Sequence, residues 1–169
     1  MDALSGSTFM EFILYNNWAN QQVLQACQNL SEDQLTAATP VAYGTIYDTL
    51  GHIIRGETFY LRLLTGSSPQ PPFKWEDRPG LAEMTAYAAQ VGQALVDMAQ
   101  RILPTDQVVE EDEGQVFHYQ ALAVFIQVIN HGIEHRTNIT TVLNQGLQKP
   151  PDVDGWGYFN AHPDRFGLK

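Results

Sequence analysis

Residues 118–146 read HYQALAVFIQVINHGIEHRTNITTVLNQG, and this stretch carries the clearest structural pattern in the chain. Its apolar side chains recur at intervals of three and four residues, which is the period of one face of an α-helix. Gly146 stands where a left-handed helix cap is expected, and Pro150 and Pro151 prevent the helix from continuing. We therefore expect a helix from about His118 to Gln145.

Two histidines, His131 and His135, lie four residues apart near the middle of this helix. Residues at that spacing share one face, and at roughly 100° per residue Val128 and Ile139 lie on the same side. Both imidazoles therefore belong to the apolar, core-facing stripe. Buried imidazoles cost free energy unless they have partners, either carboxylates and carbonyl groups or a metal ion. The pair alone leaves both interpretations open.

Three more segments show helical patterning, separated by residues that favour turns. Thr8 opens a sequence typical of a capping box, Gly66 ends the second segment, and Pro104 ends the third. Ser31 begins a second capping-box sequence, which predicts one further short helical turn. The expected long helices run from about Thr8 to Leu30, from Thr45 to Thr65 and from Leu81 to Leu103.

The remaining segments lack a long periodic pattern. The stretch from Asp106 to Gly114 contains a run of acids and is interpreted as a solvated acidic loop. A strand near Val116 to Tyr119 is not excluded, but no pattern requires a sheet. The tail from Pro151 to Lys169 is rich in Gly, Pro and aromatic residues, which predicts an ordered coil over the helices. Residues 1–169 are thus expected to form a single all-α domain, a four-helix bundle with an ordered C-terminal coil.

The composition argues against several classes of protein. With 169 residues the chain has the length of one ordinary domain, and its 44% hydrophobic residues suit a folded core. The net charge of −10, from 19 acidic and 9 basic residues, argues against nucleic acid or an anionic membrane as a partner. No apolar run is long enough to span a bilayer, and the first residues lack the pattern of a signal peptide. We expect a soluble, cytoplasmic protein.

A third histidine, His52, lies inside the second expected helix near Gly56, at the margin of the apolar face. A pocket could open there, although a partly exposed histidine is the simpler interpretation. His118 and His162 suit a shared site less well, because one lies on another helix face and the other lies in the tail. The single cysteine, Cys27, excludes a disulfide within the chain and a cysteine-rich zinc site, and its apolar stripe predicts burial.

A series of short motifs occurs along the chain: Tyr15-Asn-Asn-Trp18-Ala-Asn20, Leu30-Ser-Glu-Asp-Gln-Leu35, Leu50-Gly-His52 with Gly56-Glu57, Asn130-His131-Gly-Ile-Glu-His135-Arg136 with Asn144-Gln-Gly146, and Asp154-Gly-Trp156-Gly-Tyr158. This ordered set resembles the DinB family of metalloproteins, also called DinB/YfiT-like. Each motif is short and degenerate, but together they cover most of the chain.

The resemblance implies a four-helix bundle that binds one divalent metal ion through His52, His131 and His135. It also implies a homodimer. Some members of the family are metal-dependent thiol transferases or thiol-cofactor isomerases, and many have no known activity. Zinc suits a set of histidine nitrogens best, with nickel or iron as alternatives.

Three histidine ligands leave at least one coordination position open, whereas structural zinc sites are usually closed by four protein ligands. A thiol bound there becomes a thiolate nucleophile at neutral pH, and a bound water favours hydrolysis instead. The leading hypothesis is therefore a metal-dependent S-transferase that joins a low-molecular-weight thiol to an electrophile. The alternatives are a non-catalytic metal- or small-molecule-binding stress protein and a metal-dependent hydrolase.

Four charged residues near the histidines have several interpretations. Glu134 belongs to a His-x-x-Glu-His pattern found in some zinc peptidases, but no glutamate follows it to complete that motif, so a solvent-facing position is expected. Glu57 is either a hydrogen-bond acceptor that orients a histidine or an acid at a helix margin. Arg55 and Arg136 are the nearest candidates for holding an anionic thiol.

Overall fold

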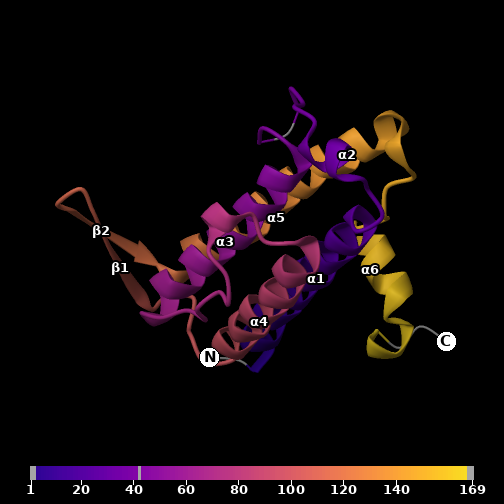
Figure 1. The fold of residues 1–169 in the computed structure, drawn as a ribbon. Helices are drawn as coiled ribbons and strands as arrows, with labels where there is room; N and C mark the ends of the chain where they lie inside the picture. Colours follow the sequence, from indigo (N-terminus) through magenta and orange to yellow (C-terminus); the bar gives the residue numbers. More distant parts are fainter. Residues whose placement is uncertain (1–2, 42, 167–169) are drawn as a thin grey trace.

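The computed structural model describes residues 3–41 and 43–166, and it is mostly helical with one small sheet. Figure 1 shows the long helices packed side by side, with a two-stranded hairpin extending from one end. The helices are α1 (Ala3–Cys27), α2 (Glu32–Thr36), α3 (Ile46–Thr65), α4 (Leu81–Ala99), α5 (Ala121–Val142) and α6 (Gly155–Ala161). The strands are β1 (Gln107–Asp112) and β2 (Gln115–Gln120).

The long helices α1, α3, α4 and α5 enclose the core. Helix α1 packs against α4 and α5, and α3 packs against the same two helices. Their inward faces bury aliphatic side chains, which is the main free-energy gain that holds such an arrangement together. Fully buried members of this core include Ile13, Val23, Ile46, Val91, Leu95, Val128 and Ile139.

The capping signals predicted at Ser31 and Gly66 are confirmed, and Thr45 caps the start of α3. The Thr45 side chain accepts a hydrogen bond from the Asp48 N–H at 3.0 Å and begins α3. Gly66 ends that helix with a φ of 77°, and its N–H donates to the Arg62 carbonyl at 2.7 Å. Ser31 and its partner at N3 form both halves of a capping box at the start of α2.

The predicted start of α1 and the predicted end of α4 are wrong. Helix α1 already begins at Ala3, so Thr8 lies inside it and is not its cap. The capping-box pattern is local and does not by itself stop a helix from starting earlier, here across Gly6. Helix α4 ends at Ala99, before the predicted Leu103. The chain turns there, because the residue before Pro104 is disfavoured in a helix and the N–H groups of residues 101 and 102 both donate to the Met98 carbonyl.

The hairpin corrects the all-α prediction. Strands β1 and β2 pair antiparallel, with Glu110 opposite Phe117, so the stretch predicted to be an acidic loop is half of a sheet and α5 begins at Ala121 instead of His118. Glu113 and Gly114 connect the strands with φ values of 47° and 78°. Two successive residues with positive φ match the twist of a tight hairpin. The acids do face solvent for the most part, as expected.

Residues 151–166 of the tail are not only coil, and residues 167–169 lie outside the described part of the chain. Helix α6 begins at Asp154, whose side chain accepts from the Gly157 N–H at 2.8 Å, and it packs on α1. Its Tyr158 hydroxyl donates to Glu11 at 2.7 Å. The glycines of α6 predict coil, but Gly157 has a packing role inside the helix. It lets α6 lie close to the backbone of Asp152, because a Cβ at Gly157 would be 2.6 Å from the Asp152 carbonyl oxygen.

Among the residues that the structure describes, no helix has the length and apolarity needed to cross a bilayer.

Candidate metal centre

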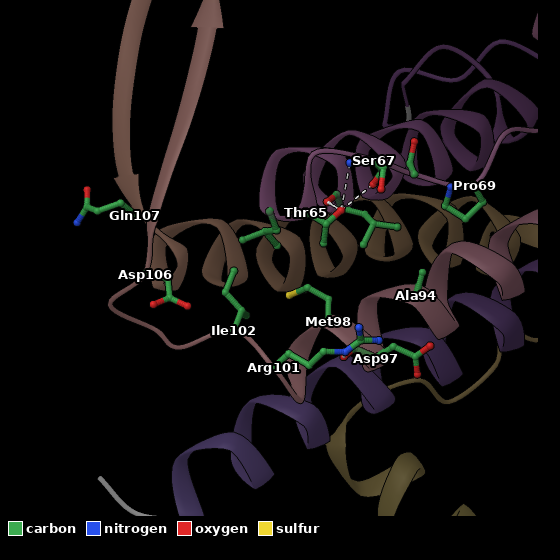
Figure 2. A pocket seen from close by; sticks show the side chains of 13 residues that line it. Thr65, Ser67, Pro69, Ala94, Asp97, Met98, Arg101, Ile102, Asp106 and Gln107 are labelled. Atoms are coloured by element: carbon green, nitrogen blue, oxygen red, sulfur yellow. Dashed lines mark hydrogen bonds between the residues drawn. The ribbon is translucent and has the colours of Figure 1, made fainter.

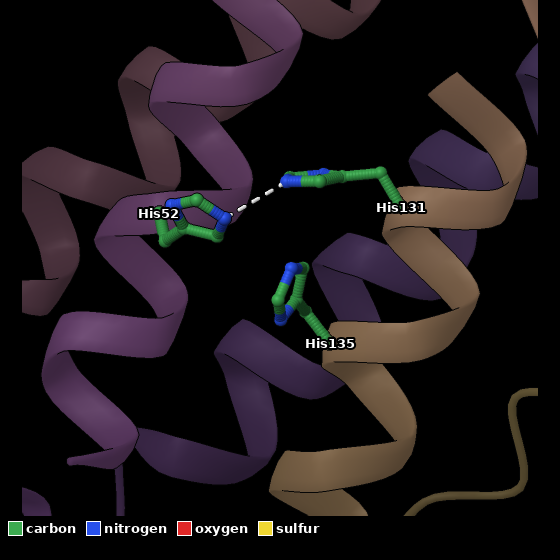
Figure 3. A group of neighbouring side chains, drawn as sticks. All are labelled: His52, His131 and His135. Carbon is green, nitrogen blue, oxygen red and sulfur yellow. Dashed lines mark hydrogen bonds between the residues drawn. The ribbon is translucent and has the colours of Figure 1, made fainter. Parts of the chain in front are cut away.

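Three histidines from two helices converge at the site. Helix α3 carries His52 and α5 carries His131 and His135, and Figure 3 shows their rings pointing toward one another. One ring nitrogen from each lies within 4.8 Å of the others, and the Nε2 atoms of His52 and His131 are 3.0 Å apart. His131 and His135 are buried, and His52 is half-buried, at the core margin where the sequence placed it.

The missing side chain of Gly56 makes room for this arrangement. A Cβ at that position would lie 2.6 Å from Cε1 of His131, so the imidazole packs directly on the backbone of α3. This close approach brings an α5 ligand within reach of His52, one turn earlier on α3.

Gly56→Ala is therefore expected to weaken metal binding by about 10- to 100-fold, the range typical of changes that misplace a ligand without removing it. The helix itself gains roughly 0.5–1 kcal/mol from alanine, so lost affinity cannot be attributed to a weaker helix. Gly155→Ala is the control, because nothing lies within 4 Å of a Cβ there. Equal zinc affinities of Gly56→Ala and wild type, measured by competition with a chelator, would show that His131 is not a ligand.

Two tyrosines flank the histidines. The Tyr43 ring stacks on His52 with centroids 4.1 Å apart, and the Tyr60 ring meets His131 edge-on at 5.6 Å. Sequence reasoning missed both. Tyr43 lies in the loop before α3, where residue spacing carries no directional information. Tyr60 is two turns beyond His52, and only the packing of α5 brings it to His131.

The electrostatic setting favours neutral imidazoles. Burial, followed by the charges of His135 and His52, lowers the pKa of His131 to about 4. Burial, followed by the charges of His135 and Arg55, also lowers the pKa of His52. Both rings are consequently neutral at pH 7, which is the form that binds a metal.

The donor set fits a divalent metal better than an internally satisfied cluster. Two nitrogens bound to one tetrahedral zinc lie roughly 3.3 Å apart, close to the 3.0 Å between His52 and His131. Among the described residues, Nδ1 of His131 and Nδ1 of His135 are buried without a hydrogen-bond partner. His131 and His52 can share one hydrogen bond through their Nε2 atoms, but the two Nδ1 atoms stay without a partner, so the cluster is not fully satisfied as core histidines usually are.

The comparison with protein families decides the identity. The model of the DinB family matches residues 4–165, nearly the whole chain. The chain belongs to the DinB family. The sequence resemblance is thus confirmed, and the family association with metals agrees with the three-histidine group. A comparison with curated proteins found no match.

Beneath the histidines of this DinB protein lies a buried polar network. Asn16 and Asn20, one turn apart on α1, each donate to Oε1 of Glu57, at 2.5 and 2.6 Å. Their amide oxygens accept from Nη1 of Arg136, at 2.7 and 2.6 Å. Two amides therefore bridge a buried carboxylate on α3 and a buried guanidinium on α5. Gly132 allows this approach, because a Cβ there would collide with Asn16 and Arg136.

This network corrects two predictions about the DinB site. Glu57 is only 2% exposed, so it is not at a helix margin, and its hydrogen bonds go to Asn16 and Asn20 rather than to a histidine. Burial raises the pKa of Glu57, opposed by the Asn16 hydrogen bond and the Arg136 charge. Arg136, also 2% exposed, is inside the protein and does not face an entering anion. The sequence signal for this network is the spacing of Asn16 and Asn20, which lie one turn apart on α1.

The other candidates lie apart from the three histidines. Glu134 is exposed, as expected. His118 is exposed on β2, and Nδ1 of His162 lies 2.9 Å from the Tyr158 carbonyl in the tail. Cys27 is fully buried, and burial raises the pKa of its thiol to about 12, which confirms its prediction as a buried hydrophobe.

Three cavities bear on ligand binding in this DinB protein. One, of about 750 Å³, lies between the C-terminal ends of α3 and α4, far along α3 from His52, and is lined by residues such as Thr65, Met98 and Arg101 (Figure 2). An apolar groove of about 290 Å³ runs between α3, α5 and the hairpin and includes Tyr60, which touches His131. A third groove, of about 210 Å³, lies on the other flank of α3 and includes Arg55.

Proposed function

We propose that this protein binds one divalent metal ion through His52, His131 and His135 and is an S-transferase that joins a low-molecular-weight thiol to an electrophile. The observation that carries the proposal is the convergence of three imidazoles, with no carboxylate in the group among the residues that the structure describes. Such a set leaves room for an exogenous ligand. Zinc is the proposed metal, with nickel or iron as alternatives, because imidazole suits all three.

The chemistry needs a nucleophilic sulfur at neutral pH. A divalent ion in the site supplies the positive charge that lowers the pKa of a thiol, and the thiolate is the nucleophile. The thiolate attacks an electrophilic carbon, a C–S bond forms, and the bond to the leaving group X breaks with its electron pair. The balance is RSH + R′X → RSR′ + H⁺ + X⁻, with the proton passing to solvent and no oxidant or reductant required.

The chain's own residues position both reactants. His131 is held by its contact with the α3 backbone at Gly56, and the rings of Tyr43 and Tyr60 limit water on two sides of the histidines. The groove next to Tyr60 is lined largely by Phe59, Leu63 and Val124 and suits an apolar electrophile. Its place beside His131 supports the transferase over the two rival functions, a binding-only stress protein and a hydrolase.

The finer architecture belongs to the same proposal. A single DinB/YfiT-like four-helix bundle over residues 1–169 is supported by the mutual packing of α1, α3, α4 and α5. A cytoplasmic location, the absence of nucleic acid and membrane partners, and a homodimer remain predictions from composition and resemblance.

The spectrum of cobalt-substituted protein tests the proposed function. Adding millimolar glutathione is expected to produce a sulfur-to-cobalt charge-transfer band, because a thiolate enters the open position. Cys27→Ser is the control for sulfur from the protein, and it should behave like wild type because Cys27 is fully buried. A spectrum that no common cellular thiol changes would contradict the transferase and favour metal binding alone or hydrolysis.

A further inference from the structure

Two arginines share one flank of α3. Arg55, Phe59 and Arg62 are spaced by four and three residues, so they form one stripe along the helix. All three line the groove of about 210 Å³ between α3 and the loop that follows it. The remaining lining includes hydroxyl and amide groups, from Thr58, Ser68, Gln70 and Tyr87.

Both guanidinium groups are held on aromatic rings and are free of acidic partners. Arg55 lies over Trp75 at 4.9 Å from the ring centroid, and Arg62 lies over Phe59 at 5.8 Å. Within residues 3–41 and 43–166, the ion pair between Arg165 and Glu11 is the one salt bridge formed, so neither arginine has a carboxylate at that range. In a chain with 19 acids and 9 bases, two unpaired neighbouring arginines mark a local site of positive charge.

None of the three histidines lines this groove, but its Arg55 end lies on α3 about one turn beyond His52. Gly51 precedes His52 and has no side chain. If it carried a Cβ, that atom would lie 3.2 Å from Nη1 of Arg55. The guanidinium is therefore folded back along α3 toward the histidine end of the groove. The apolar groove on the other side of α3 has no basic lining residue and includes Glu110, which repels a carboxylate. Phe59 lines both grooves and stands between them.

We propose that the Arg55–Arg62 groove is an anion subsite that binds the carboxylate groups of an anionic thiol, so that the enzyme selects carboxylate-bearing thiols over neutral ones. The proposal rests on the proposed thiol-transferase function and adds the class of its thiol substrate. Planar guanidinium groups bind carboxylates through paired hydrogen bonds, and an aromatic surface beneath them keeps them in place. The electrophile then occupies the apolar groove.

The variant that tests this subsite is Arg62→Gln, because Arg62 is the arginine farther from His52. Glutathione, which carries carboxylates, and 2-mercaptoethanol, which carries none, are titrated into cobalt-substituted protein. Arg62→Gln is expected to raise the apparent Kd of glutathione about tenfold, the effect of one lost charge-assisted contact, and to leave that of 2-mercaptoethanol within twofold of wild type. Arg78→Gln is the matched control: Arg78 also lies over an aromatic ring, that of Tyr47 at 4.8 Å, but outside the groove.

The subsite would be overturned if Arg62→Gln raised the apparent Kd values of glutathione and 2-mercaptoethanol equally. It would also be overturned if Arg78→Gln raised the Kd of glutathione as much as Arg62→Gln does. Calorimetry with S-methylglutathione separates this proposal from the proposed function, because that ligand keeps the carboxylates and has no thiol. If S-methylglutathione binds wild type and binds Arg62→Gln about tenfold more weakly, the subsite is supported even when no thiol changes the cobalt spectrum. Failure of S-methylglutathione to bind wild type at millimolar concentration would overturn it even if thiols do reach the metal.

Discussion

His135→Ala is expected to lower zinc affinity by more than about 100-fold, beyond the 10- to 100-fold typical of substitutions around a metal site. His135 supplies one of the three ring nitrogens that lie within 4.8 Å of one another. Without it only His52 and His131 remain, and two ligands bind a divalent ion weakly. Helicity should be kept, because alanine is a strong helix former and the substitution removes a buried nitrogen that has no partner among the described residues.

Elemental analysis of the purified variant, together with circular dichroism, measures both parts of this prediction. His118→Ala is the matched control, since His118 is an exposed histidine on β2 away from the other three. It should keep one metal per chain. Full metal occupancy in His135→Ala would contradict the assignment of the three histidines as ligands. An equal loss of metal from His135→Ala and His118→Ala would indicate nonspecific binding at the surface.

Arg136→Met is expected to destabilise the protein by about 3–5 kcal/mol, the range typical of removing one charged member from a buried, hydrogen-bonded cluster of charges. Glu57 stays buried, and the amide oxygens of Asn16 and Asn20 each lose the donor that Nη1 supplies. Methionine is chosen because its unbranched side chain fills part of the volume without charge. Urea denaturation measures the change in the free energy of unfolding.

Two further variants separate charge from packing. Arg165→Met removes the surface ion pair with Glu11, whose side chains are 42% and 32% exposed, and should cost at most about 1 kcal/mol. Glu57→Gln combined with Arg136→Met removes both charges and should recover part of the stability lost in the single variant. If Arg136→Met costs no more than Arg165→Met, the network does not hold α1, α3 and α5 together as the hydrogen bonds indicate.

The hairpin shows where sequence interpretation was too local. The acids before Glu113 were interpreted as loop because charge runs are usually solvated, and they are solvated, yet they pair with β2. A strand forms only when a second segment pairs with it. The composition of β1 alone therefore does not reveal that it pairs with β2. The turn at Glu113 and Gly114, a Glu-Gly pair rather than the common Asn-Gly or Asp-Gly, was a weak signal for a hairpin.

The features that residue spacing predicts correctly are those set within one helix. Helical periodicity places His131 and His135 on one buried face of α5. Ser31 begins α2 and Gly66 ends α3, where these capping residues were expected. These depend on backbone geometry over a few residues, which spacing encodes directly. The DinB motifs carried the rest of the site prediction, including His52.

The contacts between helices follow from the way the helices pack, and residue spacing does not predict them. It placed Tyr43 and Tyr60 against the histidines and put Arg136 inside a buried network, whereas Arg55 lines a groove. Helical spacing gives the direction of a side chain but not the distance to a neighbouring helix. That distance is set by packing, here by the glycines at 56 and 132 that let α3, α1 and α5 approach closely, and it is absent from any single segment.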